Sequence, residues 1–175
     1  MDTYKNVEKP TTIRLAGLID ESITDGPGIR YTIFTQGCNH RCVNCQNKGT
    51  WDFSGGKLAS IEKVTNDIIK KSSYLDGVTF SGGDPMYQPL ECLEIAKAIK
   101  ANTSLSIWCY TGFMFEELKG EQLKFLNYID VLVDGMYEQE HRNLALKFRG
   151  SSNQRIIDIV KTMNNKDRSV VTLDI

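Results

Sequence analysis

The sequence predicts an α/β domain, built as an open partial barrel whose largely parallel sheet has about six strands. Short apolar runs typical of strands alternate along the chain with segments of helical periodicity, and strands joined through helices form parallel sheets by right-handed crossovers. About six strands are too few to close the barrel of eight strands. The length of 175 residues fits one domain, at roughly 150 residues per domain. We therefore expect a single domain over residues 1–175, with a loose arm over residues 1–11.

The predicted elements follow one another in a regular order. Two strands, over residues 12–19 and 30–36, flank the turn sequence DGPG at residues 25–28. Ser60, a good N-cap residue, begins a helix that runs to about residue 71, because apolar residues recur there at helical spacing. Further strands are predicted over residues 77–81, 104–110, 129–134 and 169–173, and further helices from residue 89, over residues 115–127 with a break near Gly120, and over residues 153–163.

Charge and hydropathy exclude several classes of partner. The chain carries 21 Lys and Arg against 22 Asp and Glu, a formal net charge of −1, with no long block of one sign. This balance does not indicate a surface for nucleic acid. The apolar runs are far shorter than the roughly 20 residues that span a bilayer, and the N-terminus is polar. We expect a cytoplasmic protein with no membrane or nucleic-acid partner.

Cysteine usage points to metal chemistry. Five cysteines, an odd number, argue against a disulfide framework and for thiols that bind metal or pack as apolar groups. Cys38, Cys42 and Cys45 form a C-x3-C-x2-C cluster on the loop that follows the second strand. Three thiolates without a nearby fourth leave one iron of a 4Fe-4S cluster open to a substrate. Cys92 and Cys109 follow the periodicity of a helix and a strand, so we expect them to be buried structural thiols.

Two other interpretations of the cysteine cluster stay open at this point. In the first, the thiols form a structural zinc site of Cys3His type with His40 as the fourth ligand, although His40 lies inside the cysteine loop and this requires a tight wrap. In the second, the thiols pack as apolar residues, which the polar residues between them disfavour. The spacing favours an iron–sulfur cluster over both.

The chain resembles a known family through this spacing and through motifs on both sides of it. C-x3-C-x2-C is the signature of the radical S-adenosylmethionine enzymes, and DGPGIR at residues 25–30 with Asn47 and Thr50-Trp51 is similar to the activating enzymes of glycyl-radical proteins. The motifs occur in the family's order over about residues 13–160. Four more segments narrow the resemblance to activating proteins of anaerobic (class III) ribonucleoside-triphosphate reductases: SGGDP at 81–85, YTG at 110–112, DVLVDG at 130–135 and FRGSSNQR at 148–155.

The resemblance implies a radical-generating oxidoreductase. In the family, a 4Fe-4S cluster held at the positions of Cys38, Cys42 and Cys45 chelates S-adenosylmethionine through its open iron. One electron from a donor such as reduced flavodoxin cleaves the cofactor to methionine and a 5′-deoxyadenosyl radical, which abstracts a hydrogen from a glycine of the partner reductase. The cluster and the cofactor carry this chemistry, so no side chain is assigned a catalytic role.

The resemblance also implies residues that contact the cofactor. Gly82 and Gly83 correspond to a glycine pair that approaches the methionyl group with bare backbone, where a Cβ would push the ligand away. Asp84 either accepts a hydrogen bond from the methionyl ammonium or caps the following turn. Asp134 either binds the ribose or a cation, or simply forms a turn with Gly135.

Two departures from the family pattern concern the adenine and a cation. The adenine is expected beside Asn44, Cys45 and Gln46. Because Asn44 stands where many superfamily members have an aromatic residue, the contact comes from backbone or from Gln46, and Asn44 is otherwise a loop residue. Tyr110 stands where relatives that activate pyruvate formate-lyase have a carboxylate of a monovalent-cation site, which argues against such a site.

Surface residues and competing functions complete the expectations. Arg149 and Arg155 either serve partner docking or anion binding, or form surface ion pairs, and we expect His141 and Arg142 to be solvated loop residues. A part-barrel leaves its open side to a polypeptide, so we expect the substrate to be a protein. The competing functions are a radical enzyme that acts on a small molecule and a non-enzymatic zinc-binding adaptor.

Overall fold

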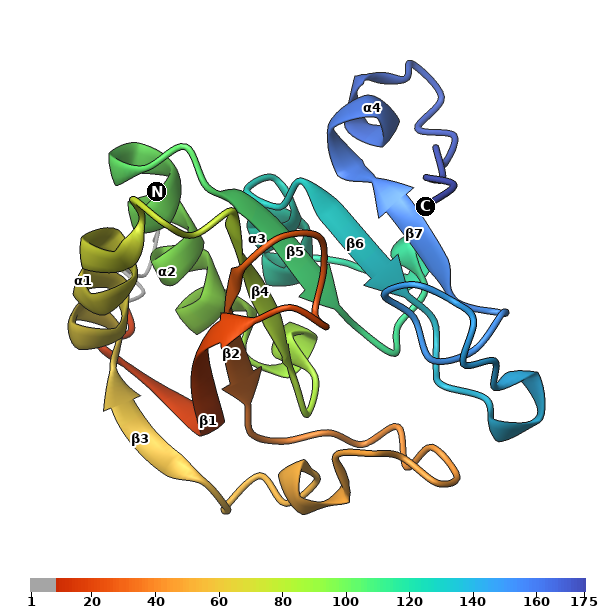
Figure 1. The fold of residues 1–175 in the computed structure, drawn as a ribbon, viewed down its shortest axis with the longest axis horizontal. Coiled ribbons are helices and arrows are strands. Elements are labelled where there is room, and N and C mark those ends of the chain that lie inside the picture. The colour runs from red at the N-terminus through yellow and green to blue at the C-terminus, as the bar shows by residue number, and fades with distance from the viewer. Residues whose placement is uncertain (1–8) are drawn as a thin grey trace, which may run out of the picture.

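The computed structural model describes residues 9–175 and shows an α/β fold around one open sheet (Figure 1). Within that range the sheet has seven strands in the order β3-β1-β2-β4-β5-β6-β7. The predicted arm over residues 1–11 lies mostly outside the described residues. The strands are β1 (Thr12–Ser22), β2 (Arg30–Thr35), β3 (Lys57–Ser60), β4 (Gly77–Gly82), β5 (Ser106–Tyr110), β6 (Val131–Asp134) and β7 (Arg155–Asp158), and the α-helices are α1 (Ile61–Lys71), α2 (Pro89–Asn102), α3 (Glu121–Leu126) and α4 (Ile159–Asn164).

The sheet is mixed rather than largely parallel. Strands β2, β4, β5 and β6 pair in parallel, whereas β1 pairs antiparallel with β2 and β3, and β6 pairs antiparallel with β7. The short connection that contains the DGPG turn joins β1 to β2, and a short connection without a crossover helix produces an antiparallel pair. The prediction was therefore correct for the open α/β class and for the central strands, and wrong for the edges. The curvature of a partial barrel stays a prediction.

The C-terminal part departs most from the prediction. The helix expected over residues 153–163 is replaced by β7, which pairs Arg155 with Asp134 and Ile157 with Leu132, and by α4 after it. Ile156 and Ile157 are both buried although they point to opposite faces, and periodicity alone cannot assign such a short apolar pair. The strand expected over residues 169–173 is reduced to one isolated bridge, between Ile157 and Thr172.

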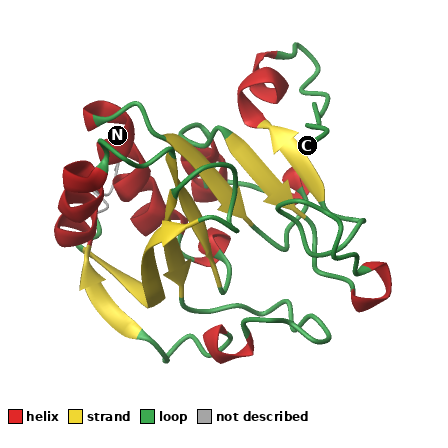
Figure 2. Ribbon diagram, viewed as in Figure 1, coloured by secondary structure: helices red, strands yellow, loops and turns green. Residues whose placement is uncertain are grey.

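The core lies between the sheet and helices α1, α2 and α3 (Figure 2). Val78 and Phe80 of β4 are fully buried two residues apart, as expected for side chains on one face of a strand. The Phe80 ring meets Phe125 of α3 edge to face, with centroids 5.1 Å apart. Helix α1 begins as predicted, with the Ser60 hydroxyl accepting from the Lys63 amide at 3.3 Å. None of the helices within residues 9–175 combines the length and apolar character needed to cross a membrane.

The parallel strands bring four loops to one edge of the sheet. Because β2, β4, β5 and β6 run in the same direction, the segments that follow their carboxyl ends are neighbours, which is where open α/β sheets bind ligands. These segments are the loop over residues 36–51 that carries the cysteine cluster (the cysteine loop), the turn over residues 83–88, the segment over residues 111–120 and the long loop over residues 135–154 (the wall loop).

Candidate functional site

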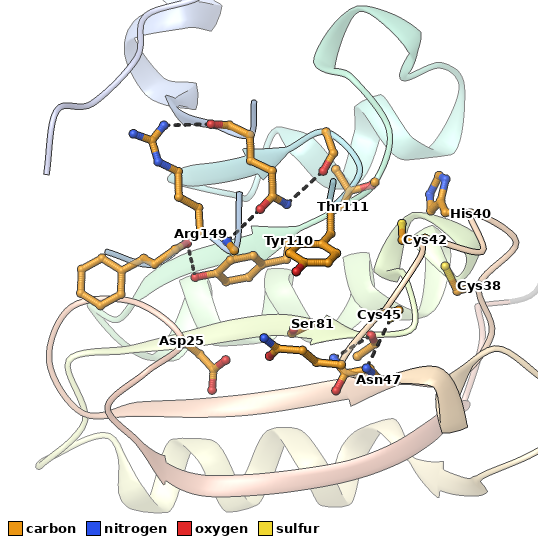
Figure 3. Close-up of a pocket in the computed structure, with 18 of the residues that line it drawn as sticks. Asp25, Cys38, His40, Cys42, Cys45, Asn47, Ser81, Tyr110, Thr111 and Arg149 are labelled. Carbon is orange, nitrogen blue, oxygen red and sulfur yellow. Dashed lines mark hydrogen bonds between the residues drawn. The ribbon is translucent and has the colours of Figure 1, made fainter. Parts of the chain in front are cut away.

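A cavity of about 710 Å³ opens at this edge, and the thiols of Cys38, Cys42 and Cys45 line it. The cysteine loop, β4 and the wall loop all contribute to its lining. Figure 3 shows the three cysteines at one end of the cavity, with Asp25 and Arg149 toward the other. Cys38 is buried and the other two thiol residues are half-buried. The cysteines therefore meet the turn at Gly82 and Gly83 (the glycine turn) at one rim of the sheet.

Backbone hydrogen bonds close the cysteine loop at its base. The Gly37 amide donates to the Thr50 carbonyl at 2.7 Å, and the Cys38 amide donates to the Trp51 carbonyl at 3.2 Å. Farther out, Arg41 and Asn44 both have a φ of 56°, a left-handed conformation that residues other than glycine rarely adopt. The loop thus turns sharply at two places to present its thiols.

Burial favours the protonated form of the Cys38 and Cys42 thiols when no metal is bound. Desolvation raises the pKa of Cys38 to about 11, although the His40 backbone amide lowers it, and desolvation also raises the pKa of Cys42. A bound cation would reverse this preference, because a coordinating thiol is deprotonated. Full burial raises the pKa of Cys92 and of Cys109 well above the ordinary value. Neither lines the cavity, in agreement with their predicted structural role.

The donor set fits an iron–sulfur cluster better than a single zinc ion. Among residues 9–175, no three cysteine, histidine, aspartate or glutamate side chains come close enough together to hold one metal ion. A cluster needs thiolates that reach different irons, and three thiols from one loop line the cavity. His40, the fourth ligand of the zinc alternative, places its Nε2 2.7 Å from Asp84 Oδ2. In the part of the chain that the structure describes, His40 and the three thiols therefore do not converge on one ion.

The glycine pair packs against protein backbone. Gly82 has a φ of 103°, and a Cβ there would stand 2.5 Å from the Thr35 amide nitrogen. A Cβ on Gly83 would stand 2.5 Å from the carbonyl oxygen of Gly37. Both glycines line the cavity, but the atoms that exclude a side chain belong to β2 and to the start of the cysteine loop. Contact with the protein itself is thus a second reason for glycine at these positions, and the contact with a ligand stays a prediction.

The two aspartates proposed as cofactor contacts are buried and do not line the cavity. Asp84 is 1% exposed and its Oδ1 accepts from the Met86 amide at 2.9 Å, which is the capping role. Asp134 is fully buried and accepts from Arg155 Nε at 2.9 Å and from the Phe115 amide at 2.7 Å. Both carboxylates bind protein donors, as buried charges require.

The segment expected beside the adenine is only partly in the lining. Gln46 lines the cavity, whereas Asn44 is exposed and does not. Cys45 Sγ accepts from the Asn47 amide at 3.4 Å, and the Asn47 side chain donates to the Gly82 carbonyl at 3.3 Å. Asn47 therefore ties the end of the cysteine cluster to the glycine turn.

The FRGSSNQR segment builds the wall of the cavity. Gln154 Oε1 accepts from the Gly150 amide at 2.9 Å, and Gln154 Nε2 donates to the Gly135 carbonyl at 3.0 Å. Arg149 donates to the Gln154 carbonyl at 2.8 Å, and the Tyr110 hydroxyl donates to the Phe148 carbonyl at 2.9 Å. This network holds the wall loop beside the ends of β5 and β6.

Arg155 forms the ion pairs that were the alternative to a docking role. Its guanidinium contacts Asp134 and, through two nitrogens at 3.0 and 2.8 Å, the Glu116 carboxylate. The two carboxylates raise the pKa of Arg155, and the Arg155 guanidinium in turn lowers the pKa of Glu116. The Arg155 guanidinium is therefore paired with carboxylates of the same chain.

Several lining residues were not singled out as site residues from the sequence. All of them except Ser81, which lies near the end of β4, are in loops, where no periodicity reports burial. Two of them could have been proposed as site residues from the sequence. Asp25 opens the DGPG turn, and Arg142 stands in the long polar wall loop. The lining residues concerned are Asp25, Asn47, Ser81, Tyr137 and Arg142.

Comparisons with known proteins support the predicted family. Residues 24–157 match the model of the 4Fe-4S single cluster domain. The chain is 40% identical over 138 residues to the anaerobic ribonucleoside-triphosphate reductase-activating protein of Enterobacteria phage T4, covering 75% of this chain and 85% of that protein. It is 36% identical over 138 residues to the protein of the same name from Escherichia coli (strain K12), covering 75% and 90%.

A similarity to a solved structure is weaker. The crystal structure of QueE from Escherichia coli matches with a TM-score of 0.45 and 20% identity, covering 58% of this chain and 52% of that chain. The sequence relatives, in contrast, match over most of both chains. The chain therefore belongs to the family of anaerobic ribonucleoside-triphosphate reductase-activating proteins.

Proposed function

We propose that this protein activates an anaerobic ribonucleoside-triphosphate reductase by generating a glycyl radical on it, through reductive cleavage of S-adenosylmethionine at a 4Fe-4S cluster. The observation that carries the proposal is the placement of three thiols from one loop in the lining of one cavity, in a chain that matches the family over most of its length. The protein thus acts as a radical-generating oxidoreductase in the cytoplasm, where thiols stay reduced.

Cys38, Cys42 and Cys45 hold the cluster in this proposal. When bound, the cluster supplies the electron that cleaves the sulfonium of S-adenosylmethionine to methionine and a 5′-deoxyadenosyl radical. A one-electron donor such as reduced flavodoxin would supply that electron to the cluster. The cavity of about 710 Å³ lies within the range of about 300–1,000 Å³ typical of small-molecule sites, so it has room for a cofactor beside the thiols.

The remaining lining residues bind and orient the cofactor. Gly82 and Gly83 present backbone to the cavity, and Gln46 presents an amide to it, suited to the polar groups of the methionyl moiety and the adenine. Asp134 acts indirectly, because it holds Arg155 and the Phe115 amide and so fixes the end of β6, from which Gly135 reaches the cavity.

The wall loop provides the contact surface for a polypeptide substrate. Leu144 lines the cavity, yet this residue is 83% exposed, and Arg142 and Lys147 lie in the same lining. This part of the wall loop borders the cavity that the thiols also line, so a polypeptide bound there would lie next to them. We place the glycine-bearing segment of the reductase between the wall loop and the cysteine loop.

The test is anaerobic incubation of the reconstituted protein with S-adenosylmethionine, a reductant and the reductase, followed by electron paramagnetic resonance. A glycyl doublet on the reductase that requires all components is expected. Cofactor cleavage with turnover of a free small molecule, and no radical on any reductase, would support the small-molecule enzyme instead. A protein that binds zinc in place of iron and sulfide would support the adaptor.

A further inference from the structure

Asp84 is a buried carboxylate that joins the ends of two strands. It follows β4, and its Oδ1 accepts from the Met86 amide at 2.9 Å. Its Oδ2 accepts from the Thr111 hydroxyl and from the Gly112 amide, both at 2.9 Å, just beyond β5. With 1% exposure and protein donors on both oxygens, this carboxylate is an anchor point between neighbouring loops.

His40 connects this anchor to the cysteine loop. Its Nε2 lies 2.7 Å from Asp84 Oδ2, and because Oδ2 already accepts from Thr111 and Gly112, we assign Nε2 as the donor. The imidazole also packs edge-on against Phe113, with centroids 4.6 Å apart, and lies 5.7 Å from the Tyr87 ring. The His40 side chain is 11% exposed, so the contact is largely shielded from water.

The position of His40 in the chain gives this contact its importance. His40 lies between Cys38 and Cys42, so fixing its side chain fixes the backbone that separates two of the thiols. The same loop contains two left-handed residues, Arg41 and Asn44, each with a φ of 56°. Non-glycine residues hold such a conformation only where the surroundings impose it.

We propose that Asp84 and His40 are positioning residues that hold the cysteine loop with its thiols facing the cavity, and that neither side chain binds the cluster or the cofactor. The proposal rests on the proposed function, because it takes the cluster to bind at these thiols. In this proposal the aspartate of the SGGDP motif, Asp84, holds the cysteine loop in place and does not contact the cofactor. The capping bond to Met86 is then one of several contacts that the same carboxylate makes.

The geometry argues against a direct ligand role for either residue. Asp84 does not line the cavity, so a ligand there does not reach its oxygens without displacing the donors of Thr111, Gly112 and His40. His40 lines the cavity, and because its Nε2 is engaged with Asp84, a metal would have to bind at Nδ1. Within residues 9–175 its ring does not join the thiols in a set that converges on one ion.

The primary test compares His40→Gln with His40→Leu. Glutamine keeps a terminal N–H donor that reaches Asp84, whereas leucine keeps bulk and loses the donor. We expect His40→Leu to lose iron to a chelator roughly tenfold or more faster than the wild-type protein, as for other residues that support metal ligands indirectly, and His40→Gln to stay close to wild type. In the metal-free protein, the amide hydrogens of residues 37–51 should exchange faster in His40→Leu than in the wild-type protein. In His40→Gln they should exchange at close to wild-type rates.

Asp84→Asn provides a second route to the same conclusion. The amide keeps the shape of the side chain but sets an N–H group against donors, so this variant should resemble His40→Leu both in iron loss and in hydrogen exchange of the metal-free loop. The matched controls are His141→Leu, at the other histidine of the chain, whose side chain is 53% exposed, and Asp67→Asn, at a carboxylate 42% exposed. Both controls should behave as wild type.

Several outcomes would overturn the proposal. One is a His40→Leu protein with wild-type iron retention and wild-type exchange of the loop. Another is a His40→Gln protein that loses iron as fast as His40→Leu, since a ligand role makes the two equivalent. A missing thermal transition would show that His40→Leu does not fold. The comparison of Asp84→Asn with His40→Gln then tests the proposal. Wild-type iron retention and loop exchange in Asp84→Asn would refute the role of the His40–Asp84 contact. If the wild-type protein holds no cluster, the proposed function fails, while hydrogen exchange of the metal-free loop still tests the pair.

Discussion

Gly83 packs so closely on Gly37 that a methyl group on Gly83 would lie 2.5 Å from the Gly37 carbonyl oxygen. The next residue, Asp84, donates its amide hydrogen to that same carbonyl at 3.0 Å. Because Gly37 directly precedes Cys38, the turn after β4 sets the starting point of the cysteine loop. The glycine motif and the cysteine motif are therefore one structural unit.

We expect Gly83→Ala to lower the iron content of the reconstituted protein as well as its affinity for S-adenosylmethionine. The added Cβ displaces the backbone next to Cys38, so the defect reaches the thiols. Iron analysis and calorimetric titration with the cofactor measure the two effects. Gly49→Ala is the control, because a Cβ there meets no heavy atom within 4 Å. If Gly83→Ala keeps a normal iron content and only its cofactor binding is weakened, Gly83 contacts the ligand alone, as expected from the sequence.

Single alanine substitutions should separate the five cysteines into two groups. Replacing Cys38, Cys42 or Cys45 is expected to abolish a stable 4Fe-4S cluster, measured by iron, sulfide and visible absorbance. Replacing the buried Cys92 or Cys109 should cost about 1 kcal/mol of stability and leave the cluster intact. Loss of iron in Cys109→Ala with a full cluster in Cys42→Ala would contradict the assignment.

Arg155→Leu should destabilise the protein by about 3 kcal/mol, because it leaves the fully buried Asp134 without its ionic partner. Urea unfolding of the metal-free protein measures the change. The double variant Asp134→Asn with Arg155→Leu should recover part of the loss, since the unpaired charge is then gone. Lys124→Met removes an ion pair whose lysine is 64% exposed, and it should change stability by less than about 0.5 kcal/mol. Equal effects of Arg155→Leu and Lys124→Met would contradict the buried pair.

Leu144→Ser tests the wall loop as the contact surface for the reductase. Losing about 1 kcal/mol of apolar burial should raise the reductase concentration needed for half-maximal radical formation about fivefold. Titration of the reductase with the glycyl radical signal as readout measures this. Leu58→Ser, at a comparably exposed leucine of β3, should leave the titration unchanged. An unchanged titration for Leu144→Ser would place the docking surface elsewhere.

The stability of the metal-free protein should decline at alkaline pH through Cys38. Burial raises the pKa of this thiol from an ordinary value of 9.0 to about 11, so the folded protein binds the proton more tightly than the unfolded chain. The stability that depends on this proton is present below pH 9.0 and is lost as the pH rises toward about 11. Urea unfolding of the wild-type protein and of Cys38→Ala across this window measures it. An equally steep decline in Cys38→Ala would assign the effect to other groups.

Local signals explain what could be predicted from the sequence by itself. The helix from Ile61 begins and ends as expected, because its cap and its apolar spacing lie within one short segment. The cysteine cluster follows β2, and the glycine turn follows β4, because turn residues directly after buried strands report where those strands end. The family and its cofactor chemistry were predicted from the same short motifs.

Only the tertiary structure decided the partners of the charged residues and the arrangement at the edges of the sheet. The His40–Asp84 contact joins residues 44 positions apart, and Arg155 meets Asp134 across 21 positions, so no local pattern announces either contact. The segment that became β7 is a strand because β6 was available to pair with it, although its own residues fit a helix equally well. Spacing and periodicity report which residues are near in the chain, whereas burial and pairing depend on strands and loops that meet only after the chain has folded.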